Sequence, residues 1–334
     1  MQTNSSLDIS SISKIQIRNF KSIKDMKLDC ERVNIFIGEP NVGKSNILES
    51  LALVSMVKYS NFDLNFVRYS QFVDLFYNQD ISKEVNIKID NLSIQLSRSS
   101  NDQFNFTIDQ ANQKILLTYN RNGTLSRSSQ DSLIKENLPD IKYYKFDKFP
   151  ESLQGNETSL IPYNGENLLN VISKNKDIEE ITKLNIGKYG LRLITDRSDN
   201  RIKLLKDEGD EIVALPFKVL SDGLQRHIFN QAALLSNNNS ILVMEEPESH
   251  TFPFLTKNFS ELVAKNESNQ FFITTHNPYF VNSIIEKTKK EDLGIFIVYF
   301  ENYQTKIKKL SKTKIKELLN YDYDLFFNLD KFLE

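Results

Sequence analysis

The chain has 334 residues, of which 40% are hydrophobic, and its formal net charge is −2. A chain of this length and composition can bury a sizeable core. Its balanced charge gives no overall reason to expect that it binds a membrane or nucleic acid, so such a partner would have to be inferred from a local charged patch. One cysteine, Cys30, excludes internal disulfides and a cysteine-based metal cluster, and the chain shows neither a signal sequence nor an apolar run of about 20 residues, so we expect a cytoplasmic protein without a membrane span.

Residues 12–28 alternate between apolar and polar side chains and predict a pair of strands that leads into the best-defined motif of the chain. In this motif the apolar run 35–37 enters Gly38, four variable positions and Gly43-Lys44-Ser45, and a segment with helical apolar spacing follows. Strand, loop and helix in this order are the setting of the phosphate-binding loop G-x-x-x-x-G-K-S.

This loop predicts a nucleotide site. Its glycines allow backbone N–H groups to face a triphosphate, and the following helix adds its positive N-terminus. Lys44, expected to have no other partner in an empty site, supplies a charge for the β- and γ-phosphates, and Ser45 is expected to hold Mg²⁺. The residues expected to contact the nucleotide here are Gly38, Glu39, Pro40, Asn41, Val42, Gly43, Lys44, Ser45 and Asn46.

From residue 61 to residue 145 the pattern changes to alternation. The runs 85–89, 92–96, 104–108 and 115–119 are separated by turn-forming residues, which predicts an antiparallel sheet. Helical spacing then returns at 165–175 and 177–184, and short strands are expected at 191–195 and 201–205.

The second half of the chain carries three further motifs. Ser221 and Gly223 stand at the start of a predicted helix, where a Ser cap and a close backbone approach form a second anion clamp. An apolar strand at 241–244 ends in Glu245 and Glu246, and because buried carboxylates without a ligand are costly, the pair indicates a functional site. Another apolar strand ends at His276.

The motifs GEPNVGKS, LSDG, ILVMEEPE and FITTHNP, in this order, and the earlier I-x-I-x-N-F-K-S-I-K-D resemble the RecF/SMC-type ABC ATPases and especially their OLD-like group. The resemblance covers about residues 12–285. It implies an α/β P-loop NTPase of the ABC-ATPase head type, with an antiparallel β-rich lobe and a helical signature subdomain. The long heptad coiled coil of SMC-like members is missing, and Glu245 replaces the usual Asp, as in OLD-like sequences.

The resemblance also implies roles in hydrolysis. Glu245 would hold Mg²⁺, Glu246 would be the general base, and His276 would contact the γ-phosphate of ATP. His227 and His250 are interpreted as structural or surface residues.

The resemblance suggests contacts outside these motifs as well. Asn19 and Lys21 are candidate nucleotide contacts, although Lys21 could equally be a solvated turn residue. Either Gln71 or Gln79 could be the glutamine that touches Mg²⁺ and the attacking water, but an ordinary loop role is more common for each.

We therefore expect a single head with four parts, which are the N-terminal strands and loop (1–60), the β-rich lobe (61–150), the helical signature region (151–239) and a C-terminal part (240–334). Because one chain has one loop and one signature, the family arrangement implies a homodimer that holds ATP between two heads. A fused Toprim nuclease is not expected, since 58 residues (334 − 276) follow His276, and Asp322 and Asp324 are interpreted as surface acids.

The expected function is an ATP-driven switch for a separately encoded effector, with anti-phage defence as a candidate setting. One alternative is a RecF-like DNA-repair ATPase, and the six lysines at 306–316 are a candidate patch for nucleic acid. Another alternative is a module that binds ATP to assemble a complex without hydrolysing it.

Overall fold

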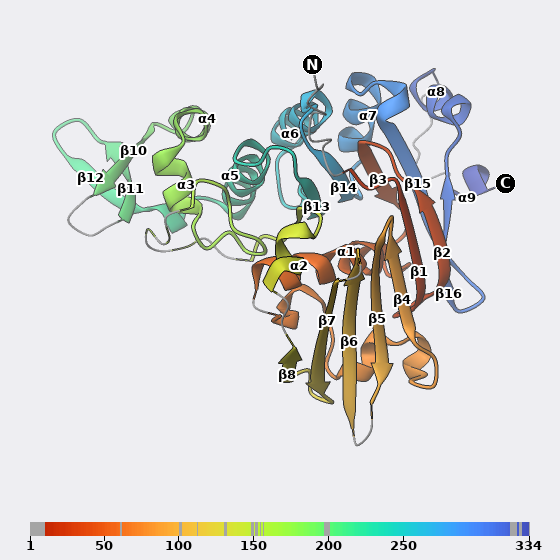
Figure 1. Cartoon of the computed structure of the whole chain (residues 1–334). Coiled ribbons are helices and arrows are strands. Elements are labelled where there is room, and N and C mark those ends of the chain that lie inside the picture. Colours follow the sequence, from red (N-terminus) through yellow and green to blue (C-terminus); the bar gives the residue numbers. More distant parts are fainter. Residues whose placement is uncertain are drawn as a thin grey trace, which may run out of the picture.

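The computed structural model describes residues 11–60, 62–99, 102–111, 113–129, 132–147, 157–196, 201–320 and 329–333, together with residues 150, 153, 155 and 326. Helix α1 (Lys44–Tyr59) lies between two large sheets (Figure 1). Twelve of its 16 residues are buried, because apolar side chains surround the helix on nearly all sides. This packing fixes the segment that follows the phosphate-binding loop.

The first large sheet is mainly parallel and has the order β16-β15-β3-β14-β13-β9. Its strands are β3 (Val33–Ile37), β9 (Ile141–Tyr144), β13 (Ile241–Glu245), β14 (Gln270–Thr274), β15 (Leu293–Glu301) and β16 (Gln304–Lys309), of which only β16 runs antiparallel to its neighbour. Its central strands are mainly apolar and are buried along almost their whole length, because both faces of the sheet are covered. The carboxyl ends of these parallel strands meet at one edge, where α1 begins.

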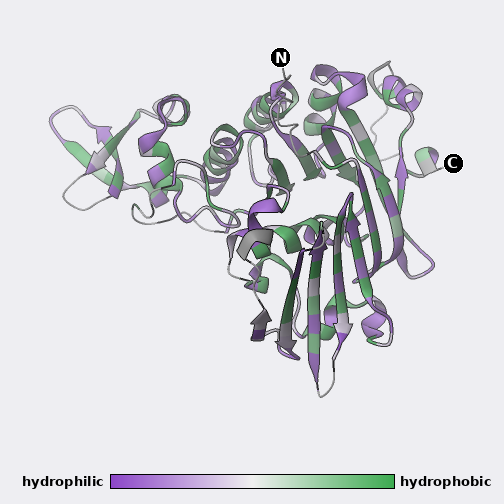
Figure 2. Cartoon of the chain, in the orientation of Figure 1, coloured by the Kyte–Doolittle hydropathy of each residue, from purple (hydrophilic) through white to green (hydrophobic). Residues whose placement is uncertain are grey.

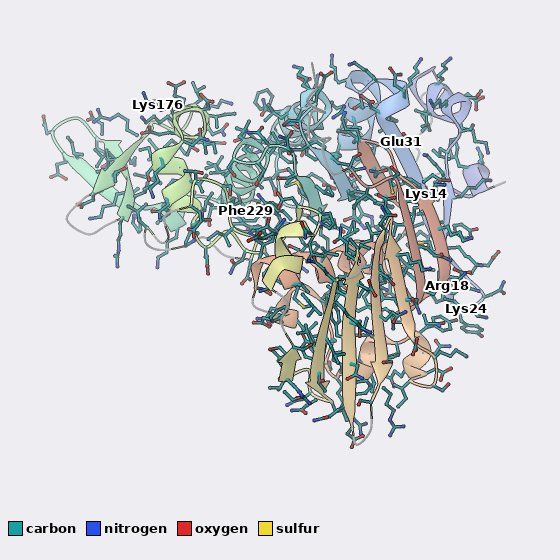
Figure 3. All side chains as sticks on the ribbon, viewed as in Figure 1. Lys14, Arg18, Lys24, Glu31, Lys176 and Phe229 are labelled. Atoms are coloured by element: carbon teal, nitrogen blue, oxygen red, sulfur yellow. The ribbon has the colours of Figure 1, made fainter. Side chains whose placement is uncertain are left out.

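The second sheet is antiparallel and has the order β2-β1-β4-β5-β6-β7-β8. Its strands are β1 (Lys14–Phe20), β2 (Ile23–Asp29), β4 (Val85–Ile89), β5 (Leu92–Arg98), β6 (Gln103–Gln110), β7 (Gln113–Asn120) and β8 (Leu125–Ser129). Hydrophobic and hydrophilic residues alternate along them (Figure 2), so that one face packs on α1 and the other meets solvent. Lys14, Arg18 and Lys24 are exposed on β1 and β2 (Figure 3).

Helices cover the other face of the parallel sheet. They include α5 (Asp222–Leu235), α6 (Pro253–Lys265), α7 (Pro278–Lys287) and α8 (Lys312–Asn320), whose apolar stripes join the core of that face. Next to α5, α3 (Leu168–Lys174) and α4 (Lys176–Gly187) carry a small antiparallel sheet of β10 (Leu191–Asp196), β11 (Arg201–Asp207) and β12 (Ile212–Pro216) at one end of the molecule (Figure 1). Two short helices, α2 (Ser132–Asn137) and α9 (Leu329–Leu333), complete the α-helices of the described ranges. Within the described ranges, no helix is long and apolar enough to span a membrane.

The strands and helices expected from the alternation and helical spacing are found, but two placements differ from expectation. Strand β1 pairs with β4, so the N-terminal strand pair belongs to the antiparallel sheet and the expected boundary at residue 60 crosses that sheet. Strand β9, which the alternating region 61–145 included, pairs in parallel with β13 in the other sheet. All four residues of β9 are buried, which suits a strand covered on both faces.

Candidate functional site

The phosphate-binding loop lies at the carboxyl end of β3 and leads directly into α1. Gly43 caps the helix in a left-handed conformation with φ of 96°, which favours glycine. A Cβ at Gly43 would collide with the side chains of Thr305 and Ser22, and one at Gly38 would collide with the carbonyl oxygen of Val298. Both glycines are therefore required by close packing of the loop against β16, β15 and the β1–β2 turn.

Lys44 folds back over the loop. Its Nζ donates hydrogen bonds to the carbonyl oxygens of Gly38, at 2.9 Å, and Glu39, at 2.7 Å. Burial lowers the pKa of Lys44 to about 8, although the charges of Glu246, Glu245 and Glu39 act in the opposite direction. The expectation that Lys44 has no other partner was wrong, because the loop carbonyls occupy its donors.

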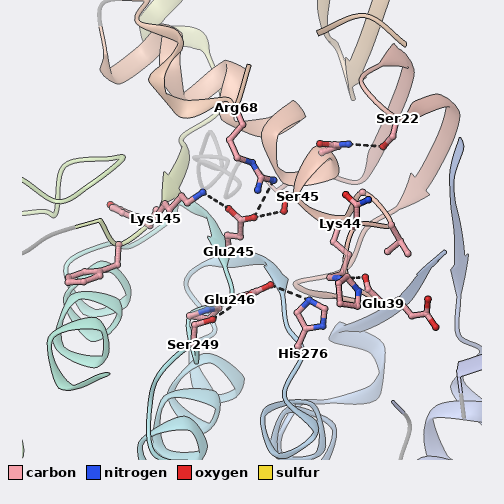
Figure 4. Close-up of a pocket in the computed structure, with 18 of the residues that line it drawn as sticks. Ser22, Glu39, Lys44, Ser45, Arg68, Lys145, Glu245, Glu246, Ser249 and His276 are labelled. Carbon is pink, nitrogen blue, oxygen red and sulfur yellow. Dashed lines mark hydrogen bonds and ion pairs between the residues drawn. The ribbon is translucent and has the colours of Figure 1, made fainter. Parts of the chain in front are cut away.

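A pocket of about 870 Å³ opens above the loop (Figure 4). The loop forms one wall, and residues at the ends of β9, β13 and β14 and in the middle of α5 form the others. Of the predicted loop residues, all but Gly38 line it. The lining consists of Glu39, Pro40, Asn41, Val42, Gly43, Lys44, Ser45 and Asn46 from the loop and helix, with Ser22, Arg68, Tyr144, Lys145, Phe146, Arg226, Asn230, Glu245, Glu246, Pro247, Ser249, His276 and Phe300.

Glu245 ends β13 in contact with Ser45, whose hydroxyl donates a hydrogen bond to Oε1. Its Oε2 accepts a hydrogen bond from the Tyr143 hydroxyl at 3.2 Å and forms an ion pair with Lys145 at 3.1 Å, while Arg68 lies 3.5 Å from Oε1. Burial favours the neutral carboxyl, but the Ser45 hydrogen bond and the two cations outweigh it and hold the pKa of Glu245 below its ordinary value. The structure thus brings the two expected Mg²⁺ ligands together.

Glu246 lies beside the residue expected to contact the γ-phosphate. Its Oε1 is 3.2 Å from Nε2 of His276, and its Oε2 accepts a hydrogen bond from the Ser249 hydroxyl at 3.0 Å (Figure 4). The hydrogen bond with His276 is the main reason that the pKa of Glu246 falls to about 2, against the effect of burial. Glu246 is therefore an ionised hydrogen-bond acceptor throughout the neutral range.

Asn19 and Lys21 are not brought to the pocket. Asn19 donates a hydrogen bond to the carbonyl oxygen of Glu84 at 3.0 Å, and Lys21 pairs with the buried carboxylate of Glu49. Arg68 binds the other oxygen of Glu49 at 2.8 Å. The turn after β1 thus contributes to an ion-pair network on α1, and the geometry does not support the predicted nucleotide contacts of these two residues.

Gln71 and Gln79 also lie away from the pocket. Gln71 precedes a short 3-10 turn and accepts a hydrogen bond from Arg121 at 3.1 Å, and Gln79 donates one to Asp74 at 2.9 Å. Among the described residues of this segment, Arg68 is the one that reaches the pocket. The choice between the two glutamines therefore stays open.

The signature residues stand at the start of α5, outside the residues that line the pocket. Ser221 and Asp222 are exposed, and Gly223 packs so closely on the backbone of His250 that a Cβ would meet its carbonyl oxygen. His250 forms an ion-pair contact of 3.0 Å with Asp222. In the single chain the expected second anion clamp therefore lies outside the pocket that holds Lys44.

The remaining candidates lie elsewhere. His227 is buried within α5, where burial lowers its pKa to about 4. The lysines at 306–316 are divided between β16 and α8, and Lys309 pairs with Glu31 at 2.7 Å. Asp322 and Asp324 lie outside the described residues.

The sequence predictions missed several residues that border the site, notably Ser22, Arg68, Tyr143 and Lys145. Lys145 directly follows the buried strand β9, but Lys142 interrupts the apolar pattern of that strand, so no clear sequence signal indicated Lys145. Arg68 lies in an irregular segment with no periodicity, and its place depends on Glu49, 19 residues earlier on α1. A sequence pattern cannot indicate that contact.

The chain is similar to known nucleotide-binding proteins. A family model described as "AAA domain, putative AbiEii toxin, Type IV TA system" matches residues 33–282. An "ATP/GTP phosphatase" of Helicobacter pylori (strain ATCC 700392 / 26695) is 23% identical over 373 residues, which cover 95% of this chain and 99% of that protein.

Among solved structures, a crystal structure of the Smc head bound to the C-winged helix domain of ScpA matches with a TM-score of 0.51 and 15% identity, and covers 92% of this chain and 99% of that one. This likeness confirms the expected fold, a P-loop NTPase of the ABC head type. The similarity to an ATP/GTP phosphatase over nearly the whole chain, together with the fold, identifies an ATP-hydrolysing enzyme. The family model covers more than half of the chain, so the protein belongs to this family of AAA domains.

Proposed function

We propose that this enzyme is an OLD-like ATPase that hydrolyses Mg-ATP between two copies of the chain and uses the reaction as a switch. One observation carries the proposal. The loop around Lys44, the carboxylates of Glu245 and Glu246, and His276 line one pocket, whereas Ser221 and Gly223 lie outside it. A pocket of about 870 Å³ is also large enough for a nucleotide.

Within one chain, positioning and charge would accelerate the reaction. Lys44 would leave the carbonyl oxygens of Gly38 and Glu39 to bind the β- and γ-phosphates of ATP. The Glu246 carboxylate would accept a hydrogen bond from the attacking water and orient it toward the γ-phosphate. His276 would turn from Glu246 to the γ-phosphate and donate to it as negative charge shifts during bond cleavage.

The donor set at the end of β13 suits Mg²⁺, which prefers oxygen ligands and usually keeps several waters. The hydroxyl of Ser45 and the carboxylate of Glu245 are already in contact, so they would hold the ion together. Bound there, Mg²⁺ would neutralise charge on the phosphates. Arg68 and Lys145 pair with Glu245 without it, and we expect them to shift toward the phosphates when the ion binds.

We further propose that the second clamp comes from another copy. Ser221 is exposed and α5 begins there, so its N-terminal N–H groups are available to an anion from outside the chain. In a two-fold dimer, each Ser221 and Gly223 would face the γ-phosphate held by Lys44 of the other chain. Hydrolysis would remove the phosphate that joins the two surfaces, so the dimer would open.

The output of the switch is proposed to be a separate effector protein. The description of the family as part of a type IV toxin–antitoxin system supports a role in which ATP controls a toxic activity, and defence against phage is a setting in which such control is useful. The native protein should be purified from its source cell with and without ATP, and the proteins retained with it should be identified. Cleavage of DNA or RNA by the isolated, homogeneous chain would contradict a separate effector.

The central proposal is tested by measuring phosphate release and mass together. The wild-type protein should release phosphate from Mg-ATP, and its mass by light scattering should rise toward that of a dimer when ATP is added. A monomer that hydrolyses ATP at full rate at all protein concentrations would exclude a site shared between two chains.

A further inference from the structure

Glu248 is a buried acid that the proposed reaction does not use. Glu248 is only 6% exposed. Its Oε1 accepts hydrogen bonds from the Thr275 hydroxyl, at 2.5 Å, and from the His276 backbone N–H, at 3.1 Å. Its Oε2 has no hydrogen-bond partner within the described part of the chain. A buried carboxyl with an unpaired oxygen is unfavourable, so packing alone does not explain a glutamate at this position.

Glu248 lies in the turn 246–251 that connects β13 to α6. Two residues of this turn, Glu246 and His250, have φ of 45° and 63°, which places them in the left-handed region that non-glycine residues rarely adopt. The turn is closed by hydrogen bonds from the Ser249 N–H to the Glu246 carbonyl and from the Thr251 N–H to the Glu248 carbonyl, both at 3.0 Å. Such a backbone persists only where its surroundings hold it.

The turn is held from two sides. On the side of α5, the Asn230 side chain donates a hydrogen bond to the Pro247 carbonyl at 2.7 Å, and Gly223 packs on the backbone of His250. On the side of the parallel sheet, Glu248 binds the residues that follow β14. The turn that carries Glu246 therefore joins the signature helix to the strand end that carries His276.

We propose that Glu248 is a positioning residue for ATP hydrolysis, which holds the His276 backbone so that the His276 side chain stays at the edge of the pocket, within reach of Glu246 and of the γ-phosphate. Glu248 itself is not among the described residues that line the pocket, so it acts through His276. This inference rests on the proposed roles of Glu246 and His276.

Three variants test the proposal in the full-length protein. Glu248→Ala removes the acceptor of both hydrogen bonds, whereas Glu248→Gln keeps an acceptor oxygen of the same reach. Ser283→Ala is the matched control, because Ser283 is also buried and its hydroxyl also has no partner in the described residues, but it lies on α7 away from the pocket. Steady-state phosphate release, the affinity for ATP and the melting temperature are measured for each.

We expect Glu248→Ala to lower kcat about 10- to 100-fold while the affinity for ATP changes less than about twofold, as for a misplaced catalytic group. Glu248→Gln should recover most of the kcat, and Ser283→Ala should match the wild type. If Glu248→Ala does not fold, Thr275→Val removes one of the two donors, together with the oxygen that accepts the Asn277 N–H, and should still lower kcat without changing the affinity for ATP. Unchanged kcat in Glu248→Ala, or in Thr275→Val where that variant replaces it, would overturn the proposal.

A loss of kcat in Glu248→Gln as large as in Glu248→Ala would also overturn the proposal, because the hydrogen bonds accepted by residue 248 would then not support turnover. His276→Ala and Glu246→Gln, measured alongside, separate this inference from the function on which it rests. If these two variants lose activity while Glu248→Ala keeps it, only the role of Glu248 fails. If His276→Ala and Glu246→Gln are fully active, the proposed site itself fails.

Discussion

The phosphate-binding loop and the signature are both helix N-termini with a serine and a glycine, yet the chain completes only one of them. Around the loop, Lys44, Ser45, Glu245 and His276 line one pocket. At the signature, Ser221 is exposed and Gly223 packs on the backbone of His250, outside that pocket. The two sites have similar local chemistry but different surroundings. Strand ends of the parallel sheet surround the phosphate-binding loop, whereas the signature lies at the surface with Ser221 exposed to solvent.

This difference indicates where each half of the site should act. A pocket with both signs of charge can hold the phosphates and the metal within one chain. An exposed helix N-terminus can contribute only when another molecule brings an anion to it. The comparison therefore predicts that variants of the loop region affect binding or chemistry in each chain, whereas variants of the signature affect association.

Lys44→Ala should have the largest effect. It removes the cation of the loop, and we expect weaker ATP binding and a loss of turnover of about 100-fold or more. Lys24→Ala, which changes an exposed lysine on β2, is the control and should match the wild type. Titration with labelled ATP and phosphate release measure both quantities, and wild-type values for both would exclude Lys44 from the site.

Glu246→Gln should bind ATP but turn it over about 100-fold more slowly, because the amide is a poor acceptor for the proton of the attacking water. ATP that is bound and not hydrolysed should then hold the two copies together. Native mass spectrometry with and without ATP should show dimer accumulation in this variant but not in Glu286→Gln, an exposed glutamate on α7. Equal association with and without ATP would refute the shared site.

Ser221→Arg should have a smaller effect on each isolated chain and a selective effect on the pair. Its affinity for ATP should stay near the wild-type value, because Ser221 is outside the pocket, while ATP-driven association and turnover should fall as bulk and charge enter the clamp. Ser128→Arg, on the exposed strand β8, is the matched control. Normal turnover in Ser221→Arg would show that the signature does not act across two chains.

The last expected effect is on stability and not on turnover, and it concerns Glu248, which joins the two regions. Burial raises the pKa of Glu248 to about 7 from an ordinary value of 4.5, so between these pH values the folded chain keeps a proton that the unfolded chain has released. Its stabilising contribution is therefore complete below pH 4.5 and is lost as the pH rises to about 7. The difference of about 2.5 between the two pKa values corresponds to a loss of about 3 kcal/mol.

Glu248→Gln cannot lose this proton. Compared with the wild type, its free energy of unfolding should therefore fall less between pH 5 and pH 8. Denaturant unfolding at the two pH values measures the difference. The same pH dependence in both proteins would mean that Glu248 titrates in its ordinary range.

Much of the site could be predicted because its parts are local. The loop from Gly38 to Ser45, the carboxylates after β13 and the histidine after β14 each follow an apolar strand directly, and parallel strands end at a common edge. Asn19 and Lys21 were expected at the nucleotide from a resemblance instead. In the structure, Lys21 forms an ion pair with Glu49 instead, because a buried carboxylate is costly without a cation beside it.

The sequence by itself therefore determined the elements and the chemical groups at their ends, since both depend on residues close together in the chain. Only the tertiary structure decided which groups meet. Ser45 and Glu245 are hydrogen-bonded although they are 200 residues apart in the sequence. Tyr143 and Glu245 are 102 residues apart, and Glu248 and Thr275 are 27 residues apart. Such pairings depend on the order of strands in the sheet, which buries β9 beside β13, and the periodicity of a single segment does not contain that order.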